Sequence, residues 1–252
     1  ELSNAEYERR KLEYEDVFPM LYLKYRLKGS RKHKNIKHLV IDEMQDYSRL
    51  QYLIIRRMFS CKMTILGDRA QTMADQQQDV LQFLPGIFGK DLRRIEMRKS
   101  YRNTVEIASY AANLIGVTDL ELFERHGMPV LERDVTDLEA ALREAVDTLF
   151  PEEKTYETAA VIVPDEKTAE RAYLILREIL AEKDFDCEKR LSWLNRDSSS
   201  FKKGLTVTTF YLAKGLEFDQ VFSIFPKDEK REMMMQAQYI AATRALHELR
   251  VY

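Results

Sequence analysis

Short apolar segments alternate with helix-like segments along this chain, and that alternation constrains the fold more than any other feature. The apolar segments are continuous runs rather than strict apolar–polar alternations, as in HLVID at 38–42, KMTIL at 62–66, AAVIVP at 159–164, GLTVTTF at 204–210 and DQVFSIF at 219–225. Strands of this kind are buried on both faces, which is typical of a parallel sheet whose crossover helices cover it. The sequence therefore predicts an α/β protein with parallel sheets and helices on both faces.

The predicted elements also suggest a division of the chain. Helices are expected at 4–28 (with a break near Pro19), 48–59, 103–115, 136–149, 166–182 and 232–245. Asn103 is expected to cap the third of these, and Pro85 with Gly86 to end a short helical turn at 79–84. LRRIEM at 92–97 and RALHELRVY at 244–252 are predicted strands. The stretch 85–90 is favoured as the boundary between domains of residues 1–88 and 89–252.

Composition limits the classes of function. The formal net charge is −2, so no global basic field exists, and strong nucleic-acid binding would need a local patch or further protein. Cys61 and Cys187 have no CxxC spacing and the four histidines are scattered, which argues against a zinc site. No apolar run approaches the roughly 18 residues of a membrane span. These features predict a soluble, cytoplasmic protein without a membrane partner.

Acidic and amide side chains follow the first two predicted strands. Asp42 and Glu43 come directly after HLVI, and Asp68 with Gln71 follows the next strand. Ligands of parallel sheets bind beyond the carboxyl ends of the strands. Magnesium prefers oxygen ligands, and a second carboxylate can accept a proton from an attacking water. A magnesium nucleotide site and ordinary solvated turns both remain open on these residues alone.

Five short motifs in a fixed order carry a resemblance. DEMQD at 42–46, GDRAQ at 67–71, SYRN at 100–103, AKGLEFD at 213–219 and AATRA at 241–245 resemble the UvrD/Rep-like superfamily 1 helicases. The sequences of the segments DEMQDYS, YLKYRL and YLAKGLEFD are most similar to the HelD-type, RNA-polymerase-associated branch of this superfamily. The resemblance implies RecA-like domains of the P-loop NTPase type, with ATP and Mg²⁺ as cofactors.

The resemblance also implies roles for the residues of the first two motifs. Asp42 would be the magnesium ligand and Glu43 the catalytic base. Gln45 and Gln71 would respond to the terminal phosphate, and Asp68 would contribute to the same nucleotide site.

The three later motifs would supply the rest of the site. Tyr101 would stack on the adenine and Arg102 would contact the terminal phosphate. Glu217 would approach the ribose, and Gly215 would allow close backbone approach. Arg244 would be the second phosphate-facing arginine. Taken one at a time, each could equally be a surface charge, a core-edge aromatic or a turn residue.

Two departures from the family pattern qualify these implications. Ser100 stands where relatives usually have asparagine, and no GxxxxGK[ST] phosphate loop occurs, since GIFGKD at 86–91 has neither its spacing nor its hydroxyl. The chain is therefore expected to be the C-terminal portion of a larger motor, with residues 1–88 ending the first RecA-like domain and 89–252 forming the second. The missing N-terminal part of the same polypeptide would be a partner, and the isolated chain should not turn over ATP.

The expected function is that of an ATP-dependent superfamily 1 motor acting on RNA polymerase or DNA. Tyr211 occupies the position where DNA-tracking relatives typically carry a histidine, which favours RNA polymerase. A conventional 3′→5′ DNA helicase and a catalytically inactive docking module derived from a motor are the alternatives.

Overall fold

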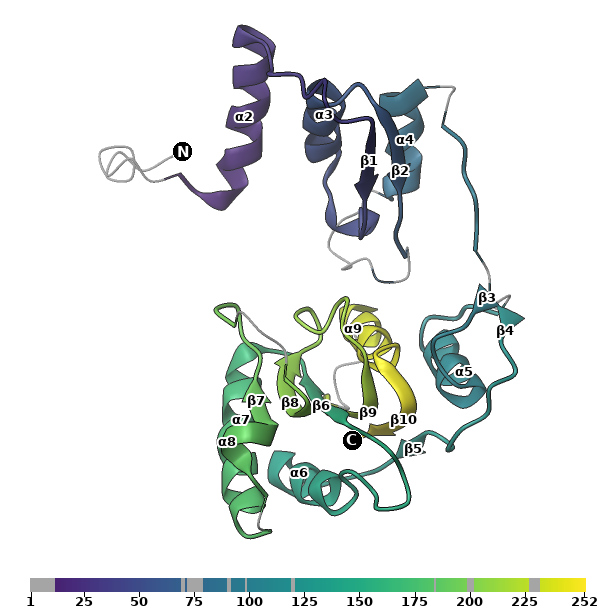
Figure 1. The fold of residues 1–252 in the computed structure, drawn as a ribbon, viewed down its shortest axis with the longest axis vertical. Coiled ribbons are helices and arrows are strands. Elements are labelled where there is room, and N and C mark those ends of the chain that lie inside the picture. The colour runs from purple at the N-terminus through teal and green to yellow at the C-terminus, as the bar shows by residue number, and fades with distance from the viewer. Residues whose placement is uncertain are drawn as a thin grey trace. The chain divides into compact units, whose positions relative to one another are not determined.

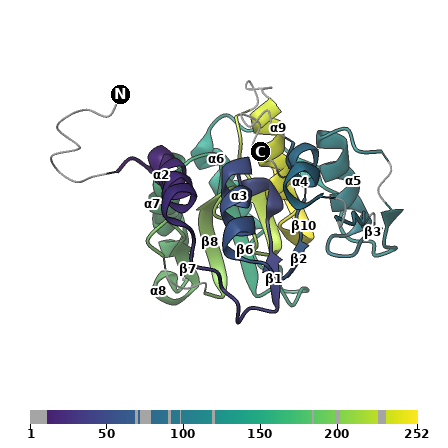
Figure 2. The same cartoon turned by 90° about the horizontal axis from the view of Figure 1, so that it is seen from above.

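The computed structural model describes residues 12–68, 71, 79–89, 92–97, 99–118, 121–183, 185–198, 202–226 and 232–252. Its chain divides into two compact units, Glu1–Ile95 and Glu96–Tyr252. Figures 1 and 2 show the elements of both units. No helix in the described ranges is long and apolar enough to cross a membrane.

The first unit is built on two parallel strands. Its elements are α2 (Tyr14–Lys28), β1 (His38–Ile41), the 3-10 helix η1 (Met44–Asp46), α3 (Arg49–Met58), β2 (Lys62–Ile65) and α4 (Val80–Phe88). Strands β1 and β2 pair in parallel, and α3 is the crossover between them. Ser48 begins α3 with a capping box, in which its hydroxyl accepts from the Gln51 N–H. A cluster of buried residues in this unit consists of Ile41, Tyr52, Val80 and Leu84.

Three expectations for residues 4–97 were wrong or incomplete. Pro85 does not end its helix, because packing of Val80 and Leu84 into the core sustains α4 to Phe88 despite the missing N–H. The predicted strand at 92–97 is not a strand: Ile95 and Met97 are 75% and 87% exposed, so no buried face exists to fix it. Helix α2 continues through Pro19, and residues 4–11 of that predicted helix lie outside the described residues.

The second unit contains a six-stranded parallel sheet. Its elements are β3 (Lys99–Ser100), α5 (Val105–Leu114), β4 (Glu121–Leu122), β5 (Leu131–Glu132), α6 (Leu138–Asp147), β6 (Thr158–Val163), α7 (Glu166–Ala181), α8 (Cys187–Arg190), β7 (Leu191–Trp193), β8 (Gly204–Thr209), β9 (Phe218–Ser223), α9 (Glu232–Ala242) and β10 (Ala245–Val251). The strand order is β5-β10-β9-β6-β8-β7, while β3 and β4 form a separate parallel pair. The predicted α/β class is confirmed.

Helices cover this sheet as the buried strands require. Helices α6 and α7 pack on one face, where the core includes Val161, Val207 and Phe222. Helix α9 packs against β9 and β10, and α5 packs against α9. Because both faces are covered, β8 is buried along its whole length, and its sequence can be apolar or β-branched at every position after Gly204.

Several elements of the second unit differ from the sequence expectation, among them a helix cap, a helix end and a short strand. Thr104, not Asn103, caps α5, and its side chain accepts from the Ile107 N–H. Helix α9 stops at Ala242 rather than at 245, because Ala245 already pairs with β9. Strand β7 was not predicted, since three residues are too few to give a periodic signal.

Candidate functional site

The two acidic residues of the first unit lie where β1 ends. The Glu43 N–H donates to Oδ1 of Asp42 at 2.8 Å, which fixes the direction of that exposed carboxylate. Glu43 itself has left-handed backbone, with φ of 52°. A residue with a Cβ pays roughly 1–2 kcal/mol for this conformation. Strain of this kind persists only where the surrounding contacts hold it.

Gln45 ties the loop after β1 to the loop after β2. Its side chain is only 3% exposed and donates from Nε2 to Oε2 of Glu43 at 2.5 Å. Its Oε1 accepts from the Asp68 N–H at 3.1 Å. One amide therefore sets the orientation of Glu43 relative to the second loop.

Gly67 allows the two loops to approach each other. A Cβ built at this position would lie 2.4 Å from Cγ of Met44 and 2.7 Å from its backbone nitrogen. The Met44 N–H donates to the Leu66 carbonyl at 2.8 Å in the same crossing. Close backbone approach, rather than an unusual φ, is what requires glycine here.

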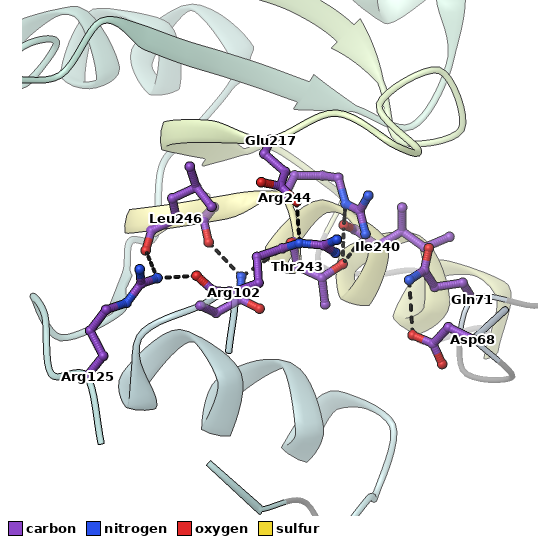
Figure 3. A network of polar contacts seen from close by, with 11 residues as sticks. Asp68, Gln71, Arg102, Arg125, Glu217, Ile240, Thr243, Arg244 and Leu246 are labelled. Atoms are coloured by element: carbon purple, nitrogen blue, oxygen red, sulfur yellow. Dashed lines mark hydrogen bonds and ion pairs between the residues drawn. The ribbon is translucent and has the colours of Figure 1, made fainter. Parts of the chain in front are cut away.

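The second loop contains a linked pair of polar side chains, drawn in Figure 3. Gln71 donates from Nε2 to Oδ2 of Asp68 at 3.0 Å. Its Oε1 is buried and accepts no hydrogen bond from the described residues. Among the described residues, Gln71 Oε1 is thus an acceptor without a donor, close to the carboxylate of Asp68.

The acidic residues fit the magnesium expected with a nucleotide, although they do not form a closed metal site. No group of three or more His, Cys, Asp or Glu side chains among the described residues could hold a metal ion. Magnesium bound with a nucleotide needs only one or two protein carboxylates, because waters and phosphate oxygens complete its six ligands. Asp42, exposed and fixed by the Glu43 N–H, is suited to that single contact.

In the second unit, Arg102 pairs with Glu217 through its Nε. Both side chains are close to half exposed, and Figure 3 shows them beside the Thr243–Arg244 turn. They come from positions 115 residues apart, one after β3 and the other just before β9. The pairing therefore brings the SYRN and AKGLEFD segments together.

Arg244 is almost fully buried, at 2% exposure, so it is not a surface charge. Its Nε donates to the Ile240 carbonyl at 3.2 Å, and Nη2 donates to the Thr243 hydroxyl at 3.0 Å. Carbonyls in the last turn of a helix lack intrahelical partners and attract cations. The guanidinium is thereby held at the C-terminal end of α9.

Asn103 and Arg125 join the SYRN segment to the AATRA segment and the start of β10. Asn103 is buried and donates from Nδ2 to the carbonyls of Thr243 and Ala245, at 3.3 and 2.6 Å. Arg125 donates from Nη2 to the Arg102 carbonyl and to the Leu246 carbonyl, the latter at 3.0 Å. Sequence reasoning missed both contacts. The Asn in SYRN was a signal for the first, and nothing local marks the second.

The remaining candidates of the second unit lie at its surface or in turns. Tyr101 is 60% exposed, its ring centroid 5.5 Å from that of Phe123, with Lys99 Nζ 5.5 Å from the Tyr101 ring centroid. Gly215 has φ of 77° and open space where a Cβ would lie, so its backbone conformation is what favours glycine. Tyr211 is half-buried and packs edge-on against Phe210 at 5.4 Å.

Only some of the candidate residues lie beyond the carboxyl ends of parallel strands, where ligands of such sheets bind. Asp42 and Asp68 follow β1 and β2, as expected, whereas Glu217 and Arg244 immediately precede β9 and β10. Glu217 and Arg244 therefore lie at the amino ends of two strands, while Arg102 follows the carboxyl end of β3. The Phe218 N–H donates to the Arg244 carbonyl at 2.9 Å and joins these two ends directly.

Searches for relatives gave similar folds but no family. No protein-family model and no curated protein matches the chain. Similar solved structures include the C-terminal domain of a possible DNA helicase from Lactobacillus plantarum WCFS1, with 24% identity, a TM-score of 0.44, and coverage of 60% of this chain and 86% of that one. The PRRSV helicase has 14% identity, a TM-score of 0.47, and coverage of 94% and 45%.

A third similar structure is the arterivirus nonstructural protein 10 helicase in complex with DNA. It has 14% identity, a TM-score of 0.45, and coverage of 86% of this chain and 39% of that one. The chain thus spans less than half the length of these viral helicases. All three TM-scores are below 0.5, so these similarities do not by themselves assign a function.

Proposed function

We propose that this chain is the C-terminal motor portion of an ATP-dependent superfamily 1 helicase or translocase, with ATP and Mg²⁺ as cofactors. The observation that carries the proposal is the convergence of three distant motifs in the second unit. Arg102 pairs with Glu217, and Asn103 bonds the backbone on both sides of Arg244. Three segments that are far apart in the sequence therefore meet at one place in the second unit, which supports a shared role.

The first unit would supply the proton chemistry. Glu43 is the proposed base for the attacking water, and the hydrogen bond from Gln45 keeps its carboxylate oriented. Bound magnesium would neutralise phosphate charge, with Asp42 as its protein ligand. Gln45 also accepts a hydrogen bond from the Asp68 N–H. A shift of the second loop would therefore move the Gln45 amide and, through it, the Glu43 carboxylate.

The second unit would supply positive charge. Guanidinium groups offset the charge that builds on a transferred phosphoryl group, and an arginine in this role is worth roughly 10³–10⁵ in rate. Arg102 is accessible to a ligand, while Arg244 is fixed at the end of α9. Glu217, which pairs with Arg102, would approach the ribose of the nucleotide.

The phosphate loop must come from elsewhere under this proposal. No GxxxxGK[ST] sequence occurs in these 252 residues. Its backbone amides and lysine normally cradle the phosphates. We propose that further residues of the same polypeptide provide it and complete the first RecA-like domain.

The ATPase assignment is tested by single-turnover hydrolysis in the parent polypeptide that carries this loop. Glu43→Gln should bind magnesium-ATP and lose hydrolysis, because an amide cannot accept the proton. Arg244→Ala should also lose hydrolysis, through the loss of charge stabilisation. Glu139→Gln and Arg143→Ala on α6 are matched controls, because these exposed residues pair with each other away from the motifs. Hydrolysis at the parental rate by either site variant would show that its role is misassigned.

The target of the motor is proposed to be RNA polymerase. Support comes from Tyr211 in place of a histidine, and from a net charge of −2 that provides no general attraction to a phosphate backbone. Binding and ATPase stimulation are to be measured with the cognate polymerase and with single-stranded DNA at physiological salt. Strand-stimulated ATPase with processive unwinding and no polymerase binding would instead favour a conventional DNA helicase.

A further inference from the structure

The segment from β4 to Gly127 wraps around the turn that carries Tyr101 and Arg102. Strand β4 pairs with β3 in parallel, and the Phe123 N–H continues this contact by donating to the Ser100 carbonyl at 3.1 Å. Further along, the Val105 N–H at the start of α5 donates to the Arg125 carbonyl at 2.9 Å. The segment is thus docked on both sides of the turn.

Arg125 extends from this segment and bridges two parts of the chain that are far apart in sequence. Its Nη2 group donates to the Arg102 carbonyl and, at 3.0 Å, to the Leu246 carbonyl. Leu246 lies in β10 where the pairing with β9 shifts register, between Ala245 and Glu248. Irregular pairing at such a shift leaves backbone groups outside the ladder. The Leu246 carbonyl has its partner in Arg125.

We propose that Arg125 is a positioning residue that sets the separation between Arg102 and Arg244. It ties the backbone of the first arginine to a carbonyl two residues beyond the second. Asn103 joins the same two segments from the buried side, so two independent links fix the spacing. This role rests on the proposed function, because it matters only if both arginines act on a phosphate.

The segment does not depend on Arg125 for its own docking. The Glu106 carboxylate accepts from the Gly127 N–H at 2.9 Å and bonds Nδ1 of His126 at 2.9 Å. Replacing Arg125 should therefore release the Arg102–Leu246 link and leave the fold intact. The expected change is in catalysis rather than in folding.

Steady-state kinetics in the parent polypeptide tests this proposal. Arg125→Gln is expected to lower kcat for ATP by about tenfold to a hundredfold, since a displacement of about 1 Å can cost that much. KM should change by less than about threefold, and the melting temperature by only a few degrees. Arg125→Lys should show the same loss, because a lysine side chain keeps the charge but ends one bond short of the Nη2 position that reaches both carbonyls. Arg143→Gln is the control.

The outcomes separate this proposal from the function on which it rests. A parent polypeptide without ATPase activity refutes the proposed function, and the role of Arg125 with it. An active parent whose kcat is unchanged in Arg125→Gln refutes only the positioning role. Full activity in Arg125→Lys would refute the role of the hydrogen bonds to the two carbonyls. The positive charge at position 125 would then be sufficient for the contribution of this residue to kcat. If Arg125→Gln does not fold, the Lys variant decides.

Discussion

Replacing Asn103 by aspartate distinguishes two roles for that side chain. If Asn103 capped α5, as the sequence predicts, aspartate would serve equally well, because both residues are favoured helix caps. In the structure the side chain is 7% exposed and donates its amide to the carbonyls of Thr243 and Ala245. A carboxylate has no such donors and would face two acceptors.

The magnitude follows from those contacts. Each lost hydrogen bond costs about 1 kcal/mol, and a buried charged group without a donor adds roughly 1–3 kcal/mol. Asn103→Asp should therefore destabilise the second unit by about 3–5 kcal/mol, and Asn103→Ala by about 2 kcal/mol. For a unit of 157 residues (252 minus 95), the aspartate variant should melt roughly 10 °C lower.

Urea unfolding followed by circular dichroism measures this difference. Asn113→Asp is the matched control, because Asn113 is exposed near the end of the same helix and its replacement should cost less than about 1 kcal/mol. The penalty of Asn103→Asp should grow as the pH rises, because desolvation raises the pKa of the new carboxyl group and its neutral form is tolerated better. Stability within about 1 kcal/mol of the parent at pH 8 would restore the capping role and contradict the structure.

Two further substitutions test other parts of the molecule. Gly67→Ala should destabilise the first unit by about 1–3 kcal/mol, because the new Cβ would lie 2.7 Å from the Met44 backbone nitrogen; an unfolding free energy equal to that of the parent would contradict this. The hydrogen bond from His126 lowers the pKa of Glu106 to about 2 from an ordinary 4.5. Its contribution to stability should therefore be complete above about pH 4.5 and disappear as the pH falls toward 2. The stability difference between the parent and Glu106→Gln, measured by urea titration at each pH, should shrink over that range; a difference independent of pH would exclude the effect.

The central strands could be predicted from sequence because strands that are buried on both faces appear as continuous apolar runs. Strands β6 and β8 are covered on both faces, so nearly every position is apolar or β-branched, while β9 carries the signal mainly at Phe218, Val221 and Phe222. Helices α3, α6 and α7 could be predicted because capping residues and apolar periodicity agree, as with Asp165 at the start of α7.

The errors arose where two local signals were equal or where tertiary contacts decided. Asn103 and Thr104 are adjacent and both are good helix caps, so only the position of the Thr243 carbonyl distinguishes them. Pro85 is a strong local breaker that packing of α4 overrides. For the candidate site, motif order indicated Arg102, Glu217 and Arg244. It could not indicate Arg125, whose partners are backbone carbonyls and leave no trace in residue type.

The left-handed backbone of Glu43 has a consequence for how this chain would change over generations. Glycine adopts that conformation freely and asparagine does so with less strain than glutamate, so substitutions that ease folding are available at this position. Selection for stability alone would favour such replacements. Under the proposed function, stability and catalysis would favour different residues at position 43, and a lineage that had lost hydrolysis would be expected to accept one of these replacements early.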